Sequence, residues 1–445
     1  MSKQMREMKD SGIEWIGEIP KEWNVIKNKY LISVLYSGGT PSATNGNFYC
    51  QEVGIPFVSI SDMSNCSYVV KTAKHITESG IEDKKLRILP IGTILYSIYA
   101  TVGAISELKV EATISQAILA IQLNSKIDKS FYKYNLTAMR DYIFSNASGN
   151  TQFNLNAEKV RNFYFVLPTF STQHRIADYL DDKCGKIDRY IEQQKQVIEK
   201  LKAYKQSVIT EAVTKGLDPT VPMKDSGVEW IGEIPEGWTI VKLGHIFSYL
   251  GGFAYNSNLY TDESDYQVVR IGNVKNYRLV LESNPVYISE STAKETSRYK
   301  LQSNTILFTM TGTKGKRDYF FTYLLTDNDV ANKNLFLNQR VGCLIPTDDI
   351  CPKYFDYLLK DNRILDSVFL YETGTANQGN LGIDSIKRTI LQFPPVSEQR
   401  QIADFLDSKC SSIDAAIAEK QNLIEKLTEY KKSLIYEVVT GKKEV

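Results

Sequence analysis

The sequence predicts a mixed α/β (α+β) protein built as a tandem repeat with a pseudo-two-fold axis. Two globular domains are expected to be separated by two long antiparallel helices that form a coiled coil. Three observations predict this fold: a sixteen-residue leader occurs twice, a 44-residue segment with helical periodicity occurs twice, and the stretches between them match faintly. In addition, 445 residues exceed the size at which one hydrophobic core normally keeps growing.

The repeated leader is the clearest sign of a duplication. Residues 10–20 read "DSGIEWIGEIP" and residues 225–235 read "DSGVEWIGEIP". The match extends over residues 8–23 and 223–238, where thirteen of sixteen positions are identical and where all four tryptophans of the chain lie. Proline, glycine and tryptophan at this density favour a turn-rich strap. We therefore expect each leader to hold one domain onto the helices.

The second repeat has the period of a helix. Residues 171–214 and 397–440 share 23 of 44 positions, and their apolar residues recur at three- and four-residue spacing. A proline precedes each segment, and Gly216 and Gly441 stand where a helix would stop. The first helix carries the chain from one domain to the next, so a two-fold axis would make the second helix run back along it. We therefore expect an antiparallel coiled coil in a dumbbell-shaped molecule.

The stretches between leader and helix predict two mixed α/β domains. Short β-branched and aromatic runs such as "TILYSIYA" and "TILFTM" alternate with Gly, Ser and Asn turns, and residues 128–145 and 351–369 have helical character. Faint pairs such as "YSGG" at 36–39 and "YLGG" at 249–252 indicate that the two domains are related. The predicted boundaries are a leader at 1–23, a domain at 24–170, a central helix at 171–216, a second leader at 217–238, a second domain at 239–395 and a C-terminal helix at 396–445.

Composition and side-chain chemistry exclude several classes of function. No apolar run approaches the ~20 residues that span a bilayer, and the polar N-terminal stretch lacks the core of a signal peptide, which predicts a cytoplasmic protein. Six cysteines without a Cys-x-x-Cys pair and only three histidines indicate neither disulfides nor a metal centre. "GTKGKR" from Gly312 has Met310 where a P-loop needs its first glycine. We expect no catalytic site, metal or cofactor in this chain.

Basic and aromatic clusters in loop-like sequence point to DNA. "VVRIGNVKNYR" at 268–278 and "TGTKGKRDYFF" at 311–321 combine Arg, Lys, Asn and Tyr, which supply phosphate contacts and base-edge hydrogen bonds. Because the formal net charge is only +1, any such surface must be local. An ordinary solvated loop is the competing interpretation of each residue. The candidate DNA-binding residues are Ser37, Gly38, Thr40, Ser42, Asn45, Tyr99 and Thr101 in the first domain and Tyr255, Arg270, Asn273, Lys275, Thr313, Lys314, Lys316 and Arg317 in the second.

Identical positions on the polar face of the two helices indicate a shared partner. Packing alone explains the matched apolar seam, whereas matched polar residues need another reason. Two copies of one surface point to two copies of one partner, which we state as a hypothesis. The candidate partner-docking residues are Asp178, Lys183 and Lys205 in the first helix and Asp404, Lys409 and Lys431 in the second.

This arrangement resembles the specificity subunit of type I restriction-modification systems, over nearly the whole chain. The resemblance is carried by the leader "DSGIEWIGEIPKEW" and its copy, and by the helix starts "IADYLDDKCGKID" and "IADFLDSKCSSID". "LPTFSTQ" and "FPPVSEQ" precede these starts, and "VTKG" and "VTGK" end the helices. The first copy departs from the family pattern, because "PTFSTQ" replaces the usual double proline with Ser-Glu-Gln. That departure concerns only the local entry into the helix.

The resemblance implies a non-catalytic subunit with two target recognition domains. Each domain would read one half of a bipartite, asymmetric site in double-stranded DNA. The helices would separate the domains and dock two methyltransferase subunits, which bind S-adenosylmethionine and methylate adenine. Two restriction subunits, dependent on ATP and Mg, would complete the nuclease. Two other functions stay open: a stand-alone DNA-binding protein such as an orphan repressor, and a coiled-coil scaffold.

Overall fold

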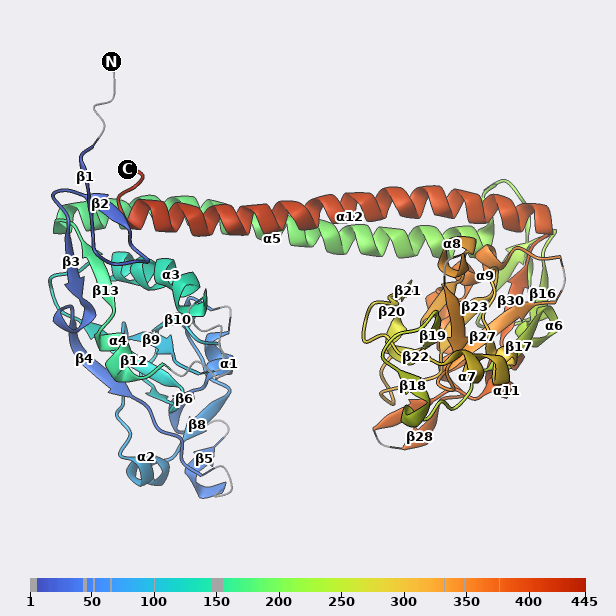
Figure 1. The fold of residues 1–445 in the computed structure, drawn as a ribbon, viewed down its shortest axis with the longest axis horizontal. Helices are drawn as coiled ribbons and strands as arrows, with labels where there is room; N and C mark the ends of the chain where they lie inside the picture. The colour runs from blue at the N-terminus through green and yellow to red at the C-terminus, as the bar shows by residue number, and fades with distance from the viewer. Residues whose placement is uncertain are drawn as a thin grey trace, which may run out of the picture. The chain divides into compact units, whose positions relative to one another are not determined.

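The computed structural model describes residues 6–42, 46–50, 53–64, 66–99, 101–145, 155–331, 333–347, 349–375 and 377–445. The chain divides into two compact units. Unit 1 is Met1–Gln194 with Asn422–Val445, and unit 2 is Lys195–Gln421. Each boundary falls inside a long helix, α5 (Phe170–Lys215) or α12 (Val396–Val439), so each unit contains part of both helices (Figure 1). Among the described residues, no helix is long and apolar enough to cross a membrane.

Unit 1 contains two sheets, a two-stranded ladder and a leader hairpin. The larger sheet has the order β4 (Ile32–Ser37), β12 (Ile118–Leu123), β9 (Ile94–Ser97), β10 (Ile105–Leu108) and β7 (Tyr68–Val69). The smaller has the order β11 (Thr113–Ile114), β6 (Ile55–Val58), β8 (Lys74–Ile76) and β5 (Tyr49–Cys50), and β13 (Tyr164–Leu167) pairs with β3 (Asn24–Lys27). The helices besides α5 and α12 are α1 (Ile60–Met63), α2 (Glu78–Lys84), α3 (Lys129–Ser145), α4 (Ala157–Arg161) and the 3-10 turns η1 (Asn28–Tyr30) and η2 (Gly46–Phe48).

Unit 2 repeats this plan and adds two small ribbons. Its sheets are β17 (Phe247–Gly251), β27 (Val341–Pro346), β23 (Ile306–Thr309) and β25 (Thr322–Leu324), then β18 (Tyr260–Thr261), β22 (Tyr287–Ile288), β19 (Tyr266–Val269) and β26 (Asn334–Leu337). The two-stranded pairs are β16 (Thr239–Lys242) with β30 (Ile390–Phe393) and β20 (Val274–Lys275) with β21 (Arg278–Leu279), and one ribbon is β24 (Thr311–Gly312), β29 (Gln378–Asn380) and β28 (Thr373–Thr375). The helices are α6 (Leu243–Ile246), α7 (Glu290–Glu295), α8 (Asp327–Val330), α9 (Pro352–Leu358), α10 (Asn362–Phe369), α11 (Ile383–Arg388) and the 3-10 turns η3 (Ser257–Leu259), η4 (Ile271–Asn273) and η5 (Ser297–Tyr299).

Corresponding strands pair in the same way in both units. β12 lies between β4 and β9 with antiparallel neighbours, as β27 lies between β17 and β23. β6 and β11 are parallel, as are β19 and β26. The predicted mixed α/β tandem repeat with two long helices is therefore confirmed. One expected helix at residues 351–369 is instead broken into α9 and α10, because Asp361 caps the second by accepting a hydrogen bond from Arg363 N (3.0 Å).

The two long helices run antiparallel within each unit. In unit 1, Leu180 of α5 and Leu434 of α12 belong to one core, and Lys431 Nζ lies 2.6 Å from Asp188 Oδ2. In unit 2, Lys205 Nζ lies 2.6 Å from Asp414 Oδ2. Later residues of one helix thus meet earlier residues of the other in both units. Both ion pairs are related by the repeat, since each partner is displaced by 226 positions.

Each leader packs against the last turns of a long helix. The leader strands β1 (Met8–Asp10) and β2 (Glu18–Pro20) pair in the same register as β14 (Met223–Asp225) and β15 (Glu233–Pro235). The first leader buries Trp15 and Trp23 in one core with Val438 of α12, and Lys442 Nζ donates to the Ile16 carbonyl (2.6 Å). The second buries Trp238 in one core with Val213 of α5. The first leader therefore joins the two ends of the chain inside unit 1.

We expect Gly441→Ala to destabilise unit 1 by about 2–4 kcal/mol. Gly441 has φ +76°, and a Cβ atom there would lie 2.5 Å from Pro20 Cδ and 2.9 Å from Trp23 Cζ3, so backbone strain and overpacking add. Gly12 has φ +70°, but a Cβ atom there would meet no heavy atom within 4 Å beyond its chain neighbours, so Gly12→Ala should cost only about 1–2 kcal/mol. Urea unfolding of both variants followed by tryptophan fluorescence measures the difference. Equal losses would contradict the leader contact.

Candidate nucleic-acid interface

The glycine motif of each domain lets two backbone segments approach closely. A Cβ atom on Gly38, directly after β4, would lie 2.3 Å from the carbonyl oxygens of Ile114 and Ser115. One on Gly252, directly after β17, would lie 2.1 Å from the Asn338 carbonyl oxygen. Only glycine fits such positions. Gly38 therefore has a role in the fold, whereas its contact with DNA stays a prediction.

The remaining candidates of the first domain are surface residues wherever the structure describes them. Thr40 is half-buried, and its Oγ1 accepts a hydrogen bond from Gln116 N (3.3 Å). Asn45 lies outside the described residues. The exposed candidates are Ser37, Ser42, Tyr99 and Thr101. Tyr99 and Thr101 belong to the loop between β9 and β10, so their side chains are available to a ligand.

Two candidates of the second domain are interior residues. Tyr255 is 6% exposed, and its hydroxyl donates to Thr296 Oγ1 (3.0 Å). Asn273 is 2% exposed, accepts from Arg270 N (2.9 Å) and donates to two backbone carbonyls (both 3.0 Å). Because buried polar groups must keep such partners, these side chains are committed to the fold. Tyr255 and Asn273 therefore have a structural role, and direct contact of either side chain with DNA stays a prediction.

Asn273 belongs to a brace that occurs in both domains. In unit 1, Asp62 Oδ2 accepts from Ser59 N (2.8 Å), as Asn273 Oδ1 accepts from Arg270 N in unit 2. Both pairs are displaced by 211 positions. The segments 59–62 and 270–273 therefore correspond, and the brace fixes the start of the segment that follows it. In addition, Arg270 Nη2 donates to the Asn284 carbonyl (2.7 Å), which holds this candidate against its own domain.

The loop of residues 313–317 forms one structure with a hairpin that the sequence analysis did not select. Strand β24 pairs with β29, and β29 pairs with β28. Lys314 Nζ donates to the Gly374 carbonyl (2.9 Å), and Arg317 forms an ion pair with Asp366. Thr313 N donates to Asp318 Oδ1 (2.8 Å). Lys314 and Arg317 thus brace the ribbon, whereas Lys316 is exposed and has no ion pair among the described residues.

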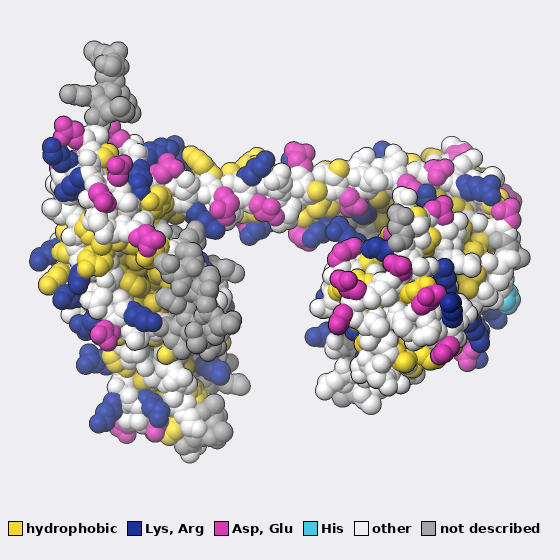
Figure 2. Space-filling model, viewed as in Figure 1, with side chains coloured by type: hydrophobic (Ala, Val, Ile, Leu, Met, Phe, Trp, Pro, Cys, Tyr) yellow, Lys and Arg dark blue, Asp and Glu magenta, His cyan; other side chains and the backbone are white. Residues whose placement is uncertain are grey.

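The hairpin carries a row of uncharged polar side chains. Figure 1 places β28 at the end of unit 2 remote from α5 and α12, and Figure 2 shows that end as largely polar or backbone surface. A β-ribbon fits the major groove, and Asn or Gln amides can pair with adenine there. The exposed residues are Thr373, Thr375, Asn377, Gln378 and Asn380. Their signal in the sequence is the Gly, Thr, Asn and Gln alternation of "ETGTANQGN".

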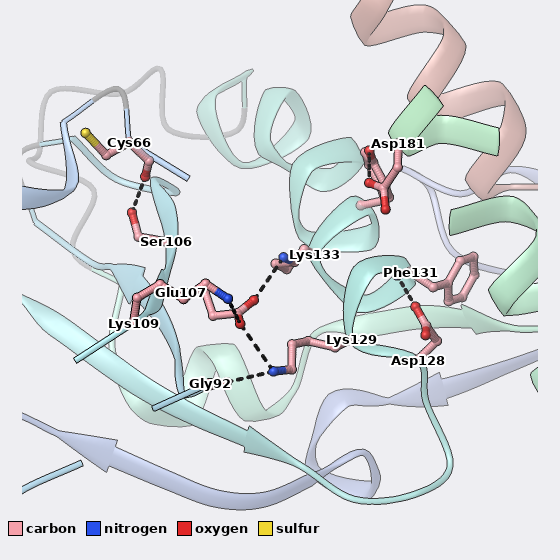
Figure 3. A network of polar contacts seen from close by, with 11 residues as sticks. Cys66, Gly92, Ser106, Glu107, Lys109, Asp128, Lys129, Phe131, Lys133 and Asp181 are labelled. Atoms are coloured by element: carbon pink, nitrogen blue, oxygen red, sulfur yellow. Dashed lines mark hydrogen bonds and ion pairs between the residues drawn. The ribbon is translucent and has the colours of Figure 1, made fainter. Parts of the chain in front are cut away.

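A second polar cluster, which the sequence did not predict, lies in unit 1. Glu107 is 6% exposed and lies 3.0 Å from Lys109 Nζ, 3.4 Å from Lys129 Nζ and 3.2 Å from Lys133 Nζ (Figure 3). Burial raises the pKa of Glu107, but the lysine hydrogen bonds and charges outweigh it and lower that pKa below its ordinary value. Lys109 and Lys133 also lie 4.4 and 5.7 Å from the ring centre of Tyr68, which is 48% exposed. Three ammonium groups against one carboxylate leave an excess of two positive charges.

Two of the predicted docking residues have a structural reason to match. Lys205 and Lys431 form the ion pairs with Asp414 and Asp188 that join the helices within each unit. The ion pairs alone can explain why the two lysines are identical, and a role of Lys205 and Lys431 in partner docking stays a prediction. Such partly exposed pairs add little stability but fix helix register.

The other four docking candidates are exposed. Asp178 and Asp404 occupy equivalent positions on the two helices, and Asp178 lies 3.8 Å from His174 Nε2. Lys183 lies 5.7 Å from the Tyr179 ring centre, and Lys409 lies 5.9 Å from that of Phe405. These cation–π pairs are again displaced by 226 positions. The polar face thus repeats in geometry as well as in sequence.

A glutamine at the start of each long helix attaches the domain to it. Gln173 is 1% exposed, accepts from Asp128 N (2.8 Å) and donates to the Pro168 carbonyl (3.0 Å). Gln399 is 0% exposed, accepts from Cys351 N (2.9 Å) and donates to the Pro394 carbonyl (2.9 Å). The Ser-Thr-Gln and Ser-Glu-Gln motifs therefore keep glutamine for a structural reason.

Comparison with known proteins agrees with the two-domain organisation of the structure. The type I restriction modification DNA specificity domain model matches residues 20–203 and 235–428. The chain is 24% identical over 439 residues to the type I restriction enzyme MjaIX specificity subunit of Methanocaldococcus jannaschii, covering 96% of this chain and 94% of that one. It is also 24% identical to the putative MjaX specificity subunit of that organism, covering 96% and 95%.

A solved structure shares the fold. A chain from a study of complex assembly and conformational transition in the type I R-M system superposes with a TM-score of 0.70 at 12% identity, covering 96% of this chain and 99% of that one. The two matched regions of the family model coincide with the two repeats seen in the sequence and the structure. Because the family model matches well over half of the residues of this chain, the chain belongs to the type I restriction modification DNA specificity family.

Proposed function

We propose that this chain reads a bipartite, asymmetric DNA site without catalysing a reaction itself, each target recognition domain contacting one half-site. One observation carries the proposal: the two domains share strand pairing and braces, but their surface loops differ in chemistry. A common scaffold with different loops suits two different base sequences, because bases are read by side chains at the groove edges. The family match does not favour an orphan repressor or a coiled-coil scaffold.

The long helices set the gap between half-sites and dock two methyltransferase subunits in this proposal. The repeated pairs of Tyr179 with Lys183 and Phe405 with Lys409 support it, since two equal partners need two equal surfaces. S-adenosylmethionine for adenine methylation would reside in the methyltransferase subunits. ATP and Mg would serve two restriction subunits. This chain contributes recognition and spacing only.

We expect Asn377→Ala and Gln378→Ala to relax one half-site. Each substitution removes an exposed amide from the ribbon without touching its backbone pairing, so discrimination at about one base pair should fall by ~1–3 kcal/mol. The measurement is single-molecule sequencing of adenine methylation after co-expression with the cognate methyltransferase subunit. The other half-site and the gap should stay unchanged.

Gln302→Ala is the matched control, because Gln302 is an exposed amide outside the ribbon. It should leave both half-sites as in the unaltered chain. An unchanged motif in Asn377→Ala and Gln378→Ala would show that the ribbon does not read bases. Co-purification of the methyltransferase with every variant verifies assembly.

Shortening both long helices by the same amount should shorten the gap. Removing residues 191–197 and 417–423, which the repeat relates, takes out ~10.5 Å of each helix. That length corresponds to about three base pairs at ~3.4 Å per step. Methylation mapping should return the same half-sites with a shorter gap. The same gap as in the unaltered chain would refute the spacing role.

A further inference from the structure

A hairpin directly after the brace in unit 2 presents two cations that the fold does not use. Strands β20 and β21 pair as Val274 with Leu279 and Lys275 with Arg278. Lys275 and Arg278 are both exposed, and neither has an ion pair among the described residues. The two residues between them, Asn276 and Tyr277, have φ of +51° and +60°. This is the backbone of a tight hairpin turn, which sets the cations side by side.

Contacts with the body of unit 2 stabilise Tyr277 in this conformation. Positive φ is unusual for a residue as bulky as tyrosine. Its ring packs edge-on against Phe321, with ring centres 5.4 Å apart, and lies 5.6 Å from Lys360 Nζ. Lys360 is itself held, because Nζ donates to Asp356 Oδ2 (2.5 Å) and its carbonyl accepts from Gln206 of α5 (3.1 Å). The turn is thereby anchored rather than free to move its cations.

Unit 1 is also cationic at the equivalent place, but through other residues. The counterparts of Lys275 and Arg278 at a distance of 211 positions are Ser64 and Ser67, which carry no charge. Next to them, Tyr68 in β7 pairs with Glu107 in β10. Figure 3 shows the lysine cluster around Glu107. The excess of two positive charges therefore comes from Lys109, Lys129 and Lys133. Both units therefore carry positive charge at this place, but different residues supply it in each unit.

This pattern distinguishes DNA from a protein partner. Two identical subunits need docking surfaces that match residue by residue, as Lys183 and Lys409 do on the helices. Phosphates are recognised by charge and carry no base sequence, so different residues serve equally well. Positive charge that is supplied by different residues in the two units therefore fits binding to the phosphate backbone.

We propose that the cations at or beside the segment after the brace are the phosphate contacts of each target recognition domain: Lys275 and Arg278 within that segment in unit 2, and the Lys109, Lys129 and Lys133 cluster beside it in unit 1. Tyr277 is a positioning residue for the two cations of unit 2. This inference rests on the proposed function, because it assigns a role within DNA binding. It also separates the residues that add affinity from the ribbon that reads bases.

The test is the salt dependence of DNA binding by the complex of this chain with its methyltransferase subunits. Lys275→Gln with Arg278→Gln removes two phosphate contacts, so the slope of log affinity against log salt should fall by about 1.8. The loss should be equal on a duplex containing the methylated target and on one with a scrambled half-site. Lys294→Gln, an exposed lysine paired with Glu290, should leave the slope unchanged.

The unit 1 cluster is tested in the same way. Lys109→Gln with Lys129→Gln removes the charge excess while Lys133 still pairs with Glu107, and the slope should again fall by up to about 1.8. An unchanged slope in either double variant overturns the proposal for that unit. Weaker co-purification of the methyltransferase with an unchanged slope would assign the cations to protein docking instead.

The positioning role of Tyr277 is tested by a measurement that a general loss of stability would not change in the same way. Tyr277→Gly permits the positive φ but removes the anchoring ring, so the slope should fall while the methylated sequence stays the same. Tyr277→Phe keeps the ring, and Asn276→Gly eases the turn, so both should bind as the unaltered chain does. An unaltered slope in Tyr277→Gly refutes the positioning role. If the unaltered complex neither binds DNA nor methylates it, the proposed function itself fails.

Discussion

The packing of α5 against α12 within each unit is the interaction on which the rest of the structure depends. Each unit combines the beginning of one helix with the end of the other, so neither core is complete without residues from distant parts of the chain. The leaders, the two buried glutamines and the interhelical ion pairs all attach to these helices. Burial of the shared apolar seam therefore organises both domains.

The two copies of the duplication share the residues that hold each domain together. They differ in the residues that each domain exposes after its brace. Gln173 and Gln399 make equivalent hydrogen bonds, and Asp62 and Asn273 brace equivalent segments although one is charged and the other is not. By contrast, the turns after the braces differ in every charged residue. Constraints from burial act on the first group, because an unpaired buried polar group is costly. The exposed group is constrained only by its ligand.

Much of the fold could be predicted from the sequence, because the duplicated leader and the long apolar seam are strong local signals. The break between α9 and α10 could not, since it depends on one side-chain cap at Asp361 inside a helical pattern. The candidate site was less predictable. Tyr255 and Asn273 have residue types suited to DNA but lie in the interior, and Gly38 serves a close backbone contact. The polar ribbon of residues 373–375 and 377–380 becomes recognisable only when β28 pairs with β29 and β29 pairs with β24.

Reading of two half-sites by two related domains is the central claim, and methylation mapping of the unaltered chain tests it most directly. The chain would be co-expressed with its cognate methyltransferase subunit, and methylated adenines would be located by single-molecule sequencing of random DNA. The structure predicts a bipartite, asymmetric motif with one constant gap, because two different reading surfaces belong to one chain. A continuous motif, or the same sequence in both halves, would contradict the account.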